Sequence, residues 1–164
     1  MPGGLLDFLD HFLDLLAVSL PGPSSKKEKF HEIPLNEMIK RSKLVVVAKV
    51  IRIEEPFLAK IAVATIEIEQ TIVGNYEGKQ IDITYYPRSG FDAWFALNQR
   101  CIFLINEGNT IVKGYAGKIP IERDKVEVRY ILGEPTNQTL KDFTQRIKDS
   151  RSRQETALDK PSSE

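Results

Sequence analysis

The residue types that most often do chemistry are few in this chain and lie far apart in the sequence. There is one cysteine, Cys101, and there are two histidines, His11 and His31. A zinc site takes four Cys or His ligands, or three with one open position, usually at short spacing. These three residues lie in unrelated segments, so the sequence predicts no metal site, and nothing else in it indicates a cofactor.

Nor does the sequence contain a recognisable catalytic arrangement. Cys101 lies within the apolar run 100–106, where a thiol acts as a small buried hydrophobe rather than as a nucleophile. Glu67 and Glu69 alternate along a predicted strand and share one face, which is typical of a solvated strand face, with an acidic site as the alternative. The segment GNYEGK at 74–79 lacks the spacing of a phosphate-binding loop. We therefore expect no catalytic residues and no enzymatic activity.

One cluster has the composition of a binding site, and it surrounds the chain's single tryptophan in a predicted loop at 87–99. Aromatic rings interleaved with arginine suit stacking on a nucleobase, or contacts with a sugar or a peptide. The alternative is that the loop folds over one end of a barrel and completes its core. The candidate ligand-binding residues are Tyr85, Tyr86, Arg88, Phe91, Trp94, Phe95 and Arg100.

The charge balance bears on the kind of partner. Lys and Arg together number 23, equal to Asp and Glu, so the net charge is zero. Nucleic-acid binders normally show a basic excess over the domain or on one face, because phosphate contacts dominate their affinity. A zero total leaves the local distribution open. We expect a protein or an extended ligand as the partner rather than a nucleic acid.

The most hydrophobic segment is near the beginning of the chain. In residues 5–20 the polar residues Asp7, Asp10, His11 and Asp14 follow helical spacing, which predicts an amphipathic helix over residues 1–20. We expect this helix to promote self-association into a homo-oligomer or to dock a partner, and the alternative is that it packs on its own domain. The candidate self-association residues are Leu5, Leu6, Phe8, Leu9, Phe12, Leu13 and Leu16.

The same segment matches neither a secretory signal nor a membrane span. It has no positively charged beginning, it is shorter than the ~20 residues that a bilayer requires, and it contains three aspartates. We therefore expect no stable membrane span and, by default, a cytoplasmic location.

Composition divides the rest of the chain into three parts. Residues 21–32 are rich in Pro, Ser and Lys and form a predicted linker; residues 33–150 form the folded domain with a C-terminal helix beginning near Thr139; and residues 151–164 lack periodicity and are predicted to be disordered. The predicted strands are 44–53, 61–73, 80–86, 100–106, 110–116, 118–121 and 125–131. In the first of them the apolar residues change phase, which predicts a β-bulge.

Three segments, KRSKLVVVAKV, IEIEQTIVGNYEGKQIDITYY and QRCIFLI, resemble small bacterial proteins with a netrin-like oligonucleotide/oligosaccharide-binding (OB) fold over residues 33–131. The resemblance implies a mainly β, five- to six-stranded OB-like barrel with flanking helices at both ends, and it suggests an extracytoplasmic location. The netrin-like fold also includes the inhibitory domain of tissue inhibitors of metalloproteinases, which implies a protease-inhibitor-like function. Those inhibitors present an N-terminal cysteine to the catalytic zinc and contain disulfides, whereas this chain has one cysteine.

Together these observations favour a non-enzymatic binding or interaction module on an OB-like barrel, with its ligand near residues 85–100. The alternatives are a single-stranded nucleic-acid binding protein and a protease-inhibitor-like protein.

Overall fold

The computed structural model describes residues 32–58, 60–90 and 92–158. The predicted N-terminal helix, most of the predicted linker and all of the candidate self-association residues lie outside these ranges. The elements follow one another as β1 (Ile33–Pro34), α2 (Leu35–Lys40), β2 (Leu44–Glu54), β3 (Ala62–Val73), β4 (Gln80–Tyr85), β5 (Arg100–Ile105), the 3-10 helix η1 (Gly114–Gly117), β6 (Lys118–Glu122), β7 (Lys125–Glu127), β8 (Ile131–Leu132), β9 (Asn137–Thr139) and α3 (Leu140–Leu158).

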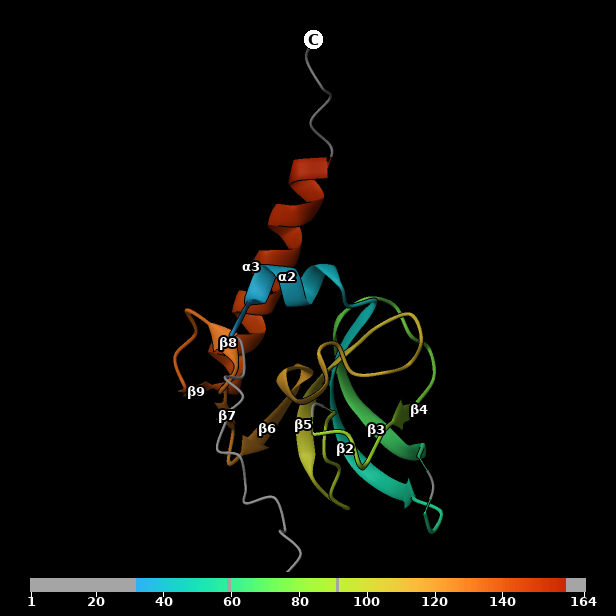
Figure 1. The fold of residues 1–164 in the computed structure, drawn as a ribbon. Coiled ribbons are helices and arrows are strands. Elements are labelled where there is room, and N and C mark those ends of the chain that lie inside the picture. The colour runs from blue at the N-terminus through green and yellow to red at the C-terminus, as the bar shows by residue number, and fades with distance from the viewer. Residues whose placement is uncertain (1–31, 59, 91, 159–164) are drawn as a thin grey trace, which may run out of the picture. The chain divides into compact units, whose positions relative to one another are not determined.

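The described strands form a mainly β fold, as predicted. Seven of them make an antiparallel sheet in the order β4-β3-β2-β5-β6-β7-β9, and β1 pairs with β8 in parallel (Figure 1). β2 is central and pairs with β3 on one side and with β5 on the other. Its long β-branched run, VVVAKVI, suits a strand whose two edges are both paired.

The predicted closure of the sheet into a barrel is not seen in the described residues. β4 and β9 stand at the two ends of the strand order. Closure would require β4 to pair with β6, but β6 pairs instead with β5 and, through a tight turn, with β7. On its free edge β4 donates a hydrogen bond from the Thr84 N–H to the carbonyl oxygen of Asn109, which lies in the loop after β5. The edge of β4 that would pair with a strand in a closed barrel thus contacts a loop instead.

The bulge predicted in β2 agrees with shifts of register in its pairing with β3. The register between β2 and β3 shifts after Val45, after Val47 and after Val50. Extra residues at such shifts bend a strand and increase its twist. Because successive side chains of a strand point to opposite faces, the buried side chains of β2 alternate between two hydrophobic clusters. Val45 and Val47 face α2 and α3, and Val46 and Ala48 face the inner side of the curved sheet.

α2 and α3 cover the outer face of the sheet and lie against each other (Figure 1). α3 begins as predicted, because the Thr139 hydroxyl accepts a hydrogen bond from the Asp142 N–H at 3.0 Å. Phe143 and Ile147 anchor the helix and are fully buried. Among the described helices, none has the length and apolar character needed to cross a membrane.

Two local predictions are wrong. Of the tail 151–164 that was predicted to be disordered, residues 151–158 continue α3, and residues 159–164 lie outside the described residues. Helix-forming residues and an ion pair between Arg151 and Glu155 at 2.9 Å sustain this part of the helix without an apolar stripe. The strand predicted at 110–116 is a single bridge, Ile105 with Ile111, followed by η1. Lys113 adopts a left-handed conformation with φ of 54°, which turns the chain out of the strand direction.

Gly74, which directly follows β3, occupies a position where a side chain does not fit. Its φ is +88°, and a Cβ atom there would lie 2.4 Å from the carbonyl oxygen of Lys43. We expect Gly74→Ala to lower the free energy of unfolding by about 2–3 kcal/mol, because backbone strain and the backbone clash act together. Gly133→Ala has the positive φ but open space and should cost about 1 kcal/mol, and Gly90→Ala should be nearly neutral. Chemical denaturation of the three variants would test this order, and equal midpoints would contradict it.

Candidate ligand-binding groove

The predicted aromatic cluster is divided between the core and the surface. Tyr85 is buried, and its ring centroid lies 4.7 Å from that of Phe95, which in turn stacks on Phe103 at 6.0 Å. Burial and the carboxylate of Glu55 raise the pKa of Tyr85 above its ordinary value. This part of the loop therefore completes the inner core, which is the alternative that the sequence left open.

Arg100 lies on the other side of the sheet from these rings. It precedes Cys101 on β5, and successive residues of a strand point to opposite faces, so Arg100 points away from the inner core. Its guanidinium pairs with Glu69 at 2.6 Å and with Asp124 at 3.5 Å. The structure thus separates Arg100 from the aromatic side chains with which it was grouped.

The remaining candidates lie in or beside the loop. Tyr86 is about half exposed, and its N–H donates to a carboxylate oxygen of Asp92. Arg88 is exposed, and Phe91 lies outside the described residues. Trp94 is 73% exposed, the largest such fraction for an aromatic side chain in the described part of this loop.

Trp94 borders a groove of about 290 Å³. The groove runs beside β6 and the segment that joins β7 to β8, and its principal side chains come from four stretches of chain. These side chains are Trp94, Tyr115, Lys118, Pro120, Arg129 and Tyr130. Rings and a proline dominate the lining, and two cations lie among them.

Two tyrosines meet in this groove. The rings of Tyr115 and Tyr130 make an edge-to-face contact with centroids 4.6 Å apart and an interplanar angle of 79°. This geometry is favourable for aromatic pairs. Tyr130 is further fixed through its backbone, since its carbonyl oxygen accepts a hydrogen bond from the Ile33 N–H at 3.1 Å. The aromatic wall is therefore held in place by the pairing of β1 with β8.

Lys118 supplies a partly buried positive charge to the groove. Its ammonium nitrogen lies 5.7 Å from the centroid of the Phe95 ring, a cation–π distance. Burial lowers the pKa of Lys118 from its ordinary value, because the charged form loses hydration. Among the described residues no carboxylate forms an ion pair with it, whereas the second cation, Arg129, is paired with Glu127. The groove thus offers one cation without a carboxylate partner.

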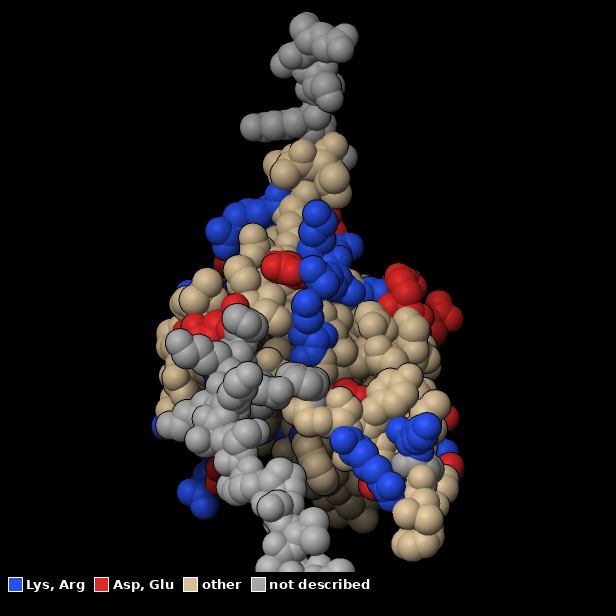
Figure 2. Space-filling model, in the orientation of Figure 1, with Lys and Arg blue, Asp and Glu red and all other residues tan. Residues whose placement is uncertain are grey.

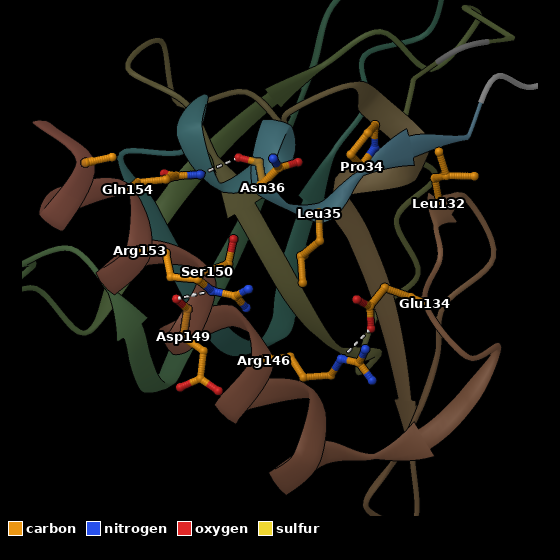
Figure 3. Close-up of a pocket in the computed structure, with 11 residues that line it drawn as sticks. Pro34, Leu35, Asn36, Leu132, Glu134, Arg146, Asp149, Ser150, Arg153 and Gln154 are labelled. Atoms are coloured by element: carbon orange, nitrogen blue, oxygen red, sulfur yellow. Dashed lines mark hydrogen bonds and ion pairs between the residues drawn. The ribbon is translucent and has the colours of Figure 1, made fainter.

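A larger hollow of about 610 Å³ lies between α2 and the C-terminal half of α3 (Figure 3). Its polar side chains bind one another or nearby backbone. Arg146 pairs with the largely buried carboxylate of Glu134 at 3.0 Å, Arg153 donates to the carbonyl oxygen of Asp149, and Gln154 donates to that of Asn36. Two of these contacts join α3 to α2 and to the turn after β8, so we interpret the side chains of this hollow as structural rather than as ligand-binding.

The charged side chains are unevenly spread despite the zero total. Figure 2 shows Lys and Arg side chains gathered around α3 and α2, with groups of Asp and Glu at both the left and the right of the view. Within the described ranges no group of three or more His, Cys, Asp or Glu side chains has the geometry of a metal site.

The sequence identified Trp94 but missed its neighbours in the groove. A signal for Lys118 was present, since it alternates with Ile119 and Ile121 and must face the opposite side of the strand from them. No local pattern brings Tyr115 to Tyr130, because that contact depends on η1 and on the pairing of β8.

The sequence matches no protein-family model and is similar to no curated protein.

Proposed function

We propose that this chain is a non-enzymatic binding module that holds an extended peptide segment in the groove beside Trp94. The exposure of Trp94 at the rim of an aromatic groove is the observation that supports this proposal most strongly. Tryptophan and tyrosine are the side chains that most often dominate the energy of protein interfaces. Grooves lined by aromatic rings bind proline-rich or other extended peptides, whose backbone needs little ordering.

The chemistry of the groove also defines which peptides it would prefer. Apolar or proline side chains would pack on Trp94 and on the Tyr115–Tyr130 pair. A carboxylate of the peptide would approach Lys118, which has no ion-pair partner among the described residues. The ligand class is therefore an extended peptide with apolar residues and at least one Asp or Glu.

The scaffold fits the OB interpretation of the strand pattern. In an OB barrel the first strand pairs with the second and the fourth, the second with the third, and the fourth with the fifth. Taking β2 to β6 as these five strands, each of these pairings has a counterpart here. We propose that the domain is an OB-like sheet in which the contact between β4 and the loop after β5 replaces the closing pair. OB folds often bind extended ligands, which agrees with the proposed groove.

Peptides selected from a random phage-displayed library would test this function. Selection on the wild-type protein, with Trp94→Ala as the counter-target, should enrich sequences that combine proline or apolar residues with Asp or Glu. A synthetic peptide of the enriched type should bind Trp94→Ala at least about 30-fold more weakly, the loss of a tryptophan hot spot. Because Trp94 is the only tryptophan, its emission should shift to shorter wavelength as the peptide covers it.

The matched control is Leu97→Ala, an exposed apolar residue of the same loop that does not line the groove. It should leave the affinity unchanged. Lys118→Met keeps the aliphatic stem of the side chain and removes its charge. It should lower the affinity for the enriched peptide about tenfold. It should leave unchanged the affinity for a version of that peptide in which Asp and Glu are replaced by Asn and Gln. Enriched peptides that bind Trp94→Ala as tightly as the wild type would contradict the proposal.

A further inference from the structure

A second groove, of about 650 Å³, lies between the turn that joins β6 to β7 and the first half of α3. Figure 1 shows β7 and β9 beside this part of the helix. On the helix its lining follows one stripe, in which Lys141, Thr144, Gln145 and Lys148 recur at helical spacing. The two lysines are seven residues apart, so they stand about 10 Å from each other along the helix axis.

The opposite wall of this groove is also basic. Arg123 and Lys125 flank Asp124 in the turn. Among the described residues no ion pair is formed by any of the four cations, whereas the single carboxylate of the lining, Asp124, already pairs with Arg100 at 3.5 Å. The lining therefore holds four cations and one carboxylate, an excess of positive charge in a chain whose net charge is zero.

The two walls are tied together by backbone contacts. Arg123 and Asp124 both adopt left-handed conformations, with φ of 48° and 62°, which is the geometry of a tight hairpin turn. The carbonyl oxygen of Asp124 accepts a hydrogen bond from the Leu140 N–H at 2.8 Å. Lys125 pairs in register with Thr139, the residue before the helix. The cations are thus presented from a fixed frame, and the groove does not have to be assembled by its ligand.

We propose that this groove binds the phosphodiester backbone of single-stranded nucleic acid. Lys, Arg, Thr and Gln are among the side chains that contact phosphate oxygens in protein–nucleic acid complexes, and these four types make up most of the lining. A groove with positive charge on both walls suits one chain that bears regularly spaced phosphates.

This site is separate from the peptide groove. Trp94 and Lys118 line one groove, and Lys141 and Lys148 line the other, with no residue in common. Within the described part of the chain no aromatic side chain lines the basic groove, so we expect binding through the nucleic-acid backbone with little base preference. Failure of either proposal leaves the other unaffected.

Fluorescence anisotropy of a labelled oligo-dT strand of about 20 nucleotides, measured over a series of salt concentrations, would test the proposal. Single strands lose affinity with a slope of about −0.7 in log K against log salt for each neutralised phosphate, so four contacts predict a slope of about −3. The double variant Lys141→Gln, Lys148→Gln should reduce the slope to about −1.5 and weaken binding several-fold at low salt. The matched control, Lys40→Gln with Lys79→Gln, removes two exposed lysines outside the groove and should leave the slope unchanged.

Any of four outcomes would overturn the proposal. The first is absence of binding at low salt, and the second is an equal loss in the groove variant and in the control variant. The third is equal competition by polyglutamate at the same concentration of charge, which would make the ligand an acidic polypeptide. Tighter binding of duplex than of single strand would retain the phosphate contacts but reject the single-stranded ligand.

Discussion

Replacing Phe103 with alanine is expected to lower the free energy of unfolding by about 3–5 kcal/mol, because a fully buried aromatic side chain is lost and the cavity does not close. Phe103 lies on β5 with none of its surface exposed, and its ring stacks on that of Phe95. The inner cluster also takes side chains from β2, β3 and β4. Its loss should therefore reduce the stability of the whole sheet, as measured by chemical denaturation.

The matched control for this variant is Phe57→Ala. Phe57 lies in the loop between β2 and β3 and is 94% exposed, so the same change in chemistry removes almost no buried area. Its free energy of unfolding should stay within about 0.5 kcal/mol of the wild type. Equal losses for Phe57→Ala and Phe103→Ala would show that the inner cluster is not the core of the domain.

The strands at 44–54, 62–73 and 80–85 could be predicted from the sequence because each has a strong local pattern. Alternating apolar residues indicate a half-buried strand, and a change of phase indicates a bulge. The capping pair of Thr139 and Asp142 likewise located the beginning of α3. These patterns involve only a few neighbouring residues, so the structures that they predict do not depend on how the rest of the chain folds.

The closure of the sheet could not be predicted in this way. The predicted strands 118–121 and 125–131 flank Arg123 and Asp124, and the structure pairs them as β6 and β7 across that turn. This pairing occupies the edge of β6 that closure onto β4 would need. A local pattern places the two strands but does not indicate which strand takes that edge, so the expected barrel is not formed in the described residues.

The candidate site was predicted only in part for a similar reason. A cluster of aromatic residues within one loop contains both core and surface positions, and composition does not distinguish them. Phe95 and Trp94 are adjacent, yet one packs between Tyr85 and Phe103 while the other is 73% exposed. The basic groove was missed because its cations come from a turn and a helix that are distant in the sequence.

The reactivity of the Cys101 thiol measures how often the inner core opens to solvent. Its thiol has no exposed surface, and burial raises its pKa from 9.0 to about 11, opposed in part by the positive charge of Lys118. At pH 8 the native thiol should react with a disulfide reagent at least about a thousandfold more slowly than in denaturant, because both the thiolate and access to it are suppressed. Since Cys101 is the only cysteine, the absorbance of the released thiol reports on this site alone. Full labelling of the native protein within seconds would show that the core opens readily.

The same raised pKa predicts how stability depends on pH. Above pH 9 the unfolded chain releases the thiol proton while the folded chain retains it up to about pH 11. The unfolded state then binds fewer protons than the folded state, so the free energy of unfolding falls as the pH rises through this window. By pH 11 the ionisation of the thiol in the unfolded chain should have lowered the free energy of unfolding by about 2 kcal/mol. Other groups titrate in the same range, so the wild type is compared with Cys101→Ala. The free energy of unfolding of this variant should fall less steeply between pH 9 and pH 11. Parallel curves of unfolding free energy against pH for the two proteins would contradict a buried, protonated thiol.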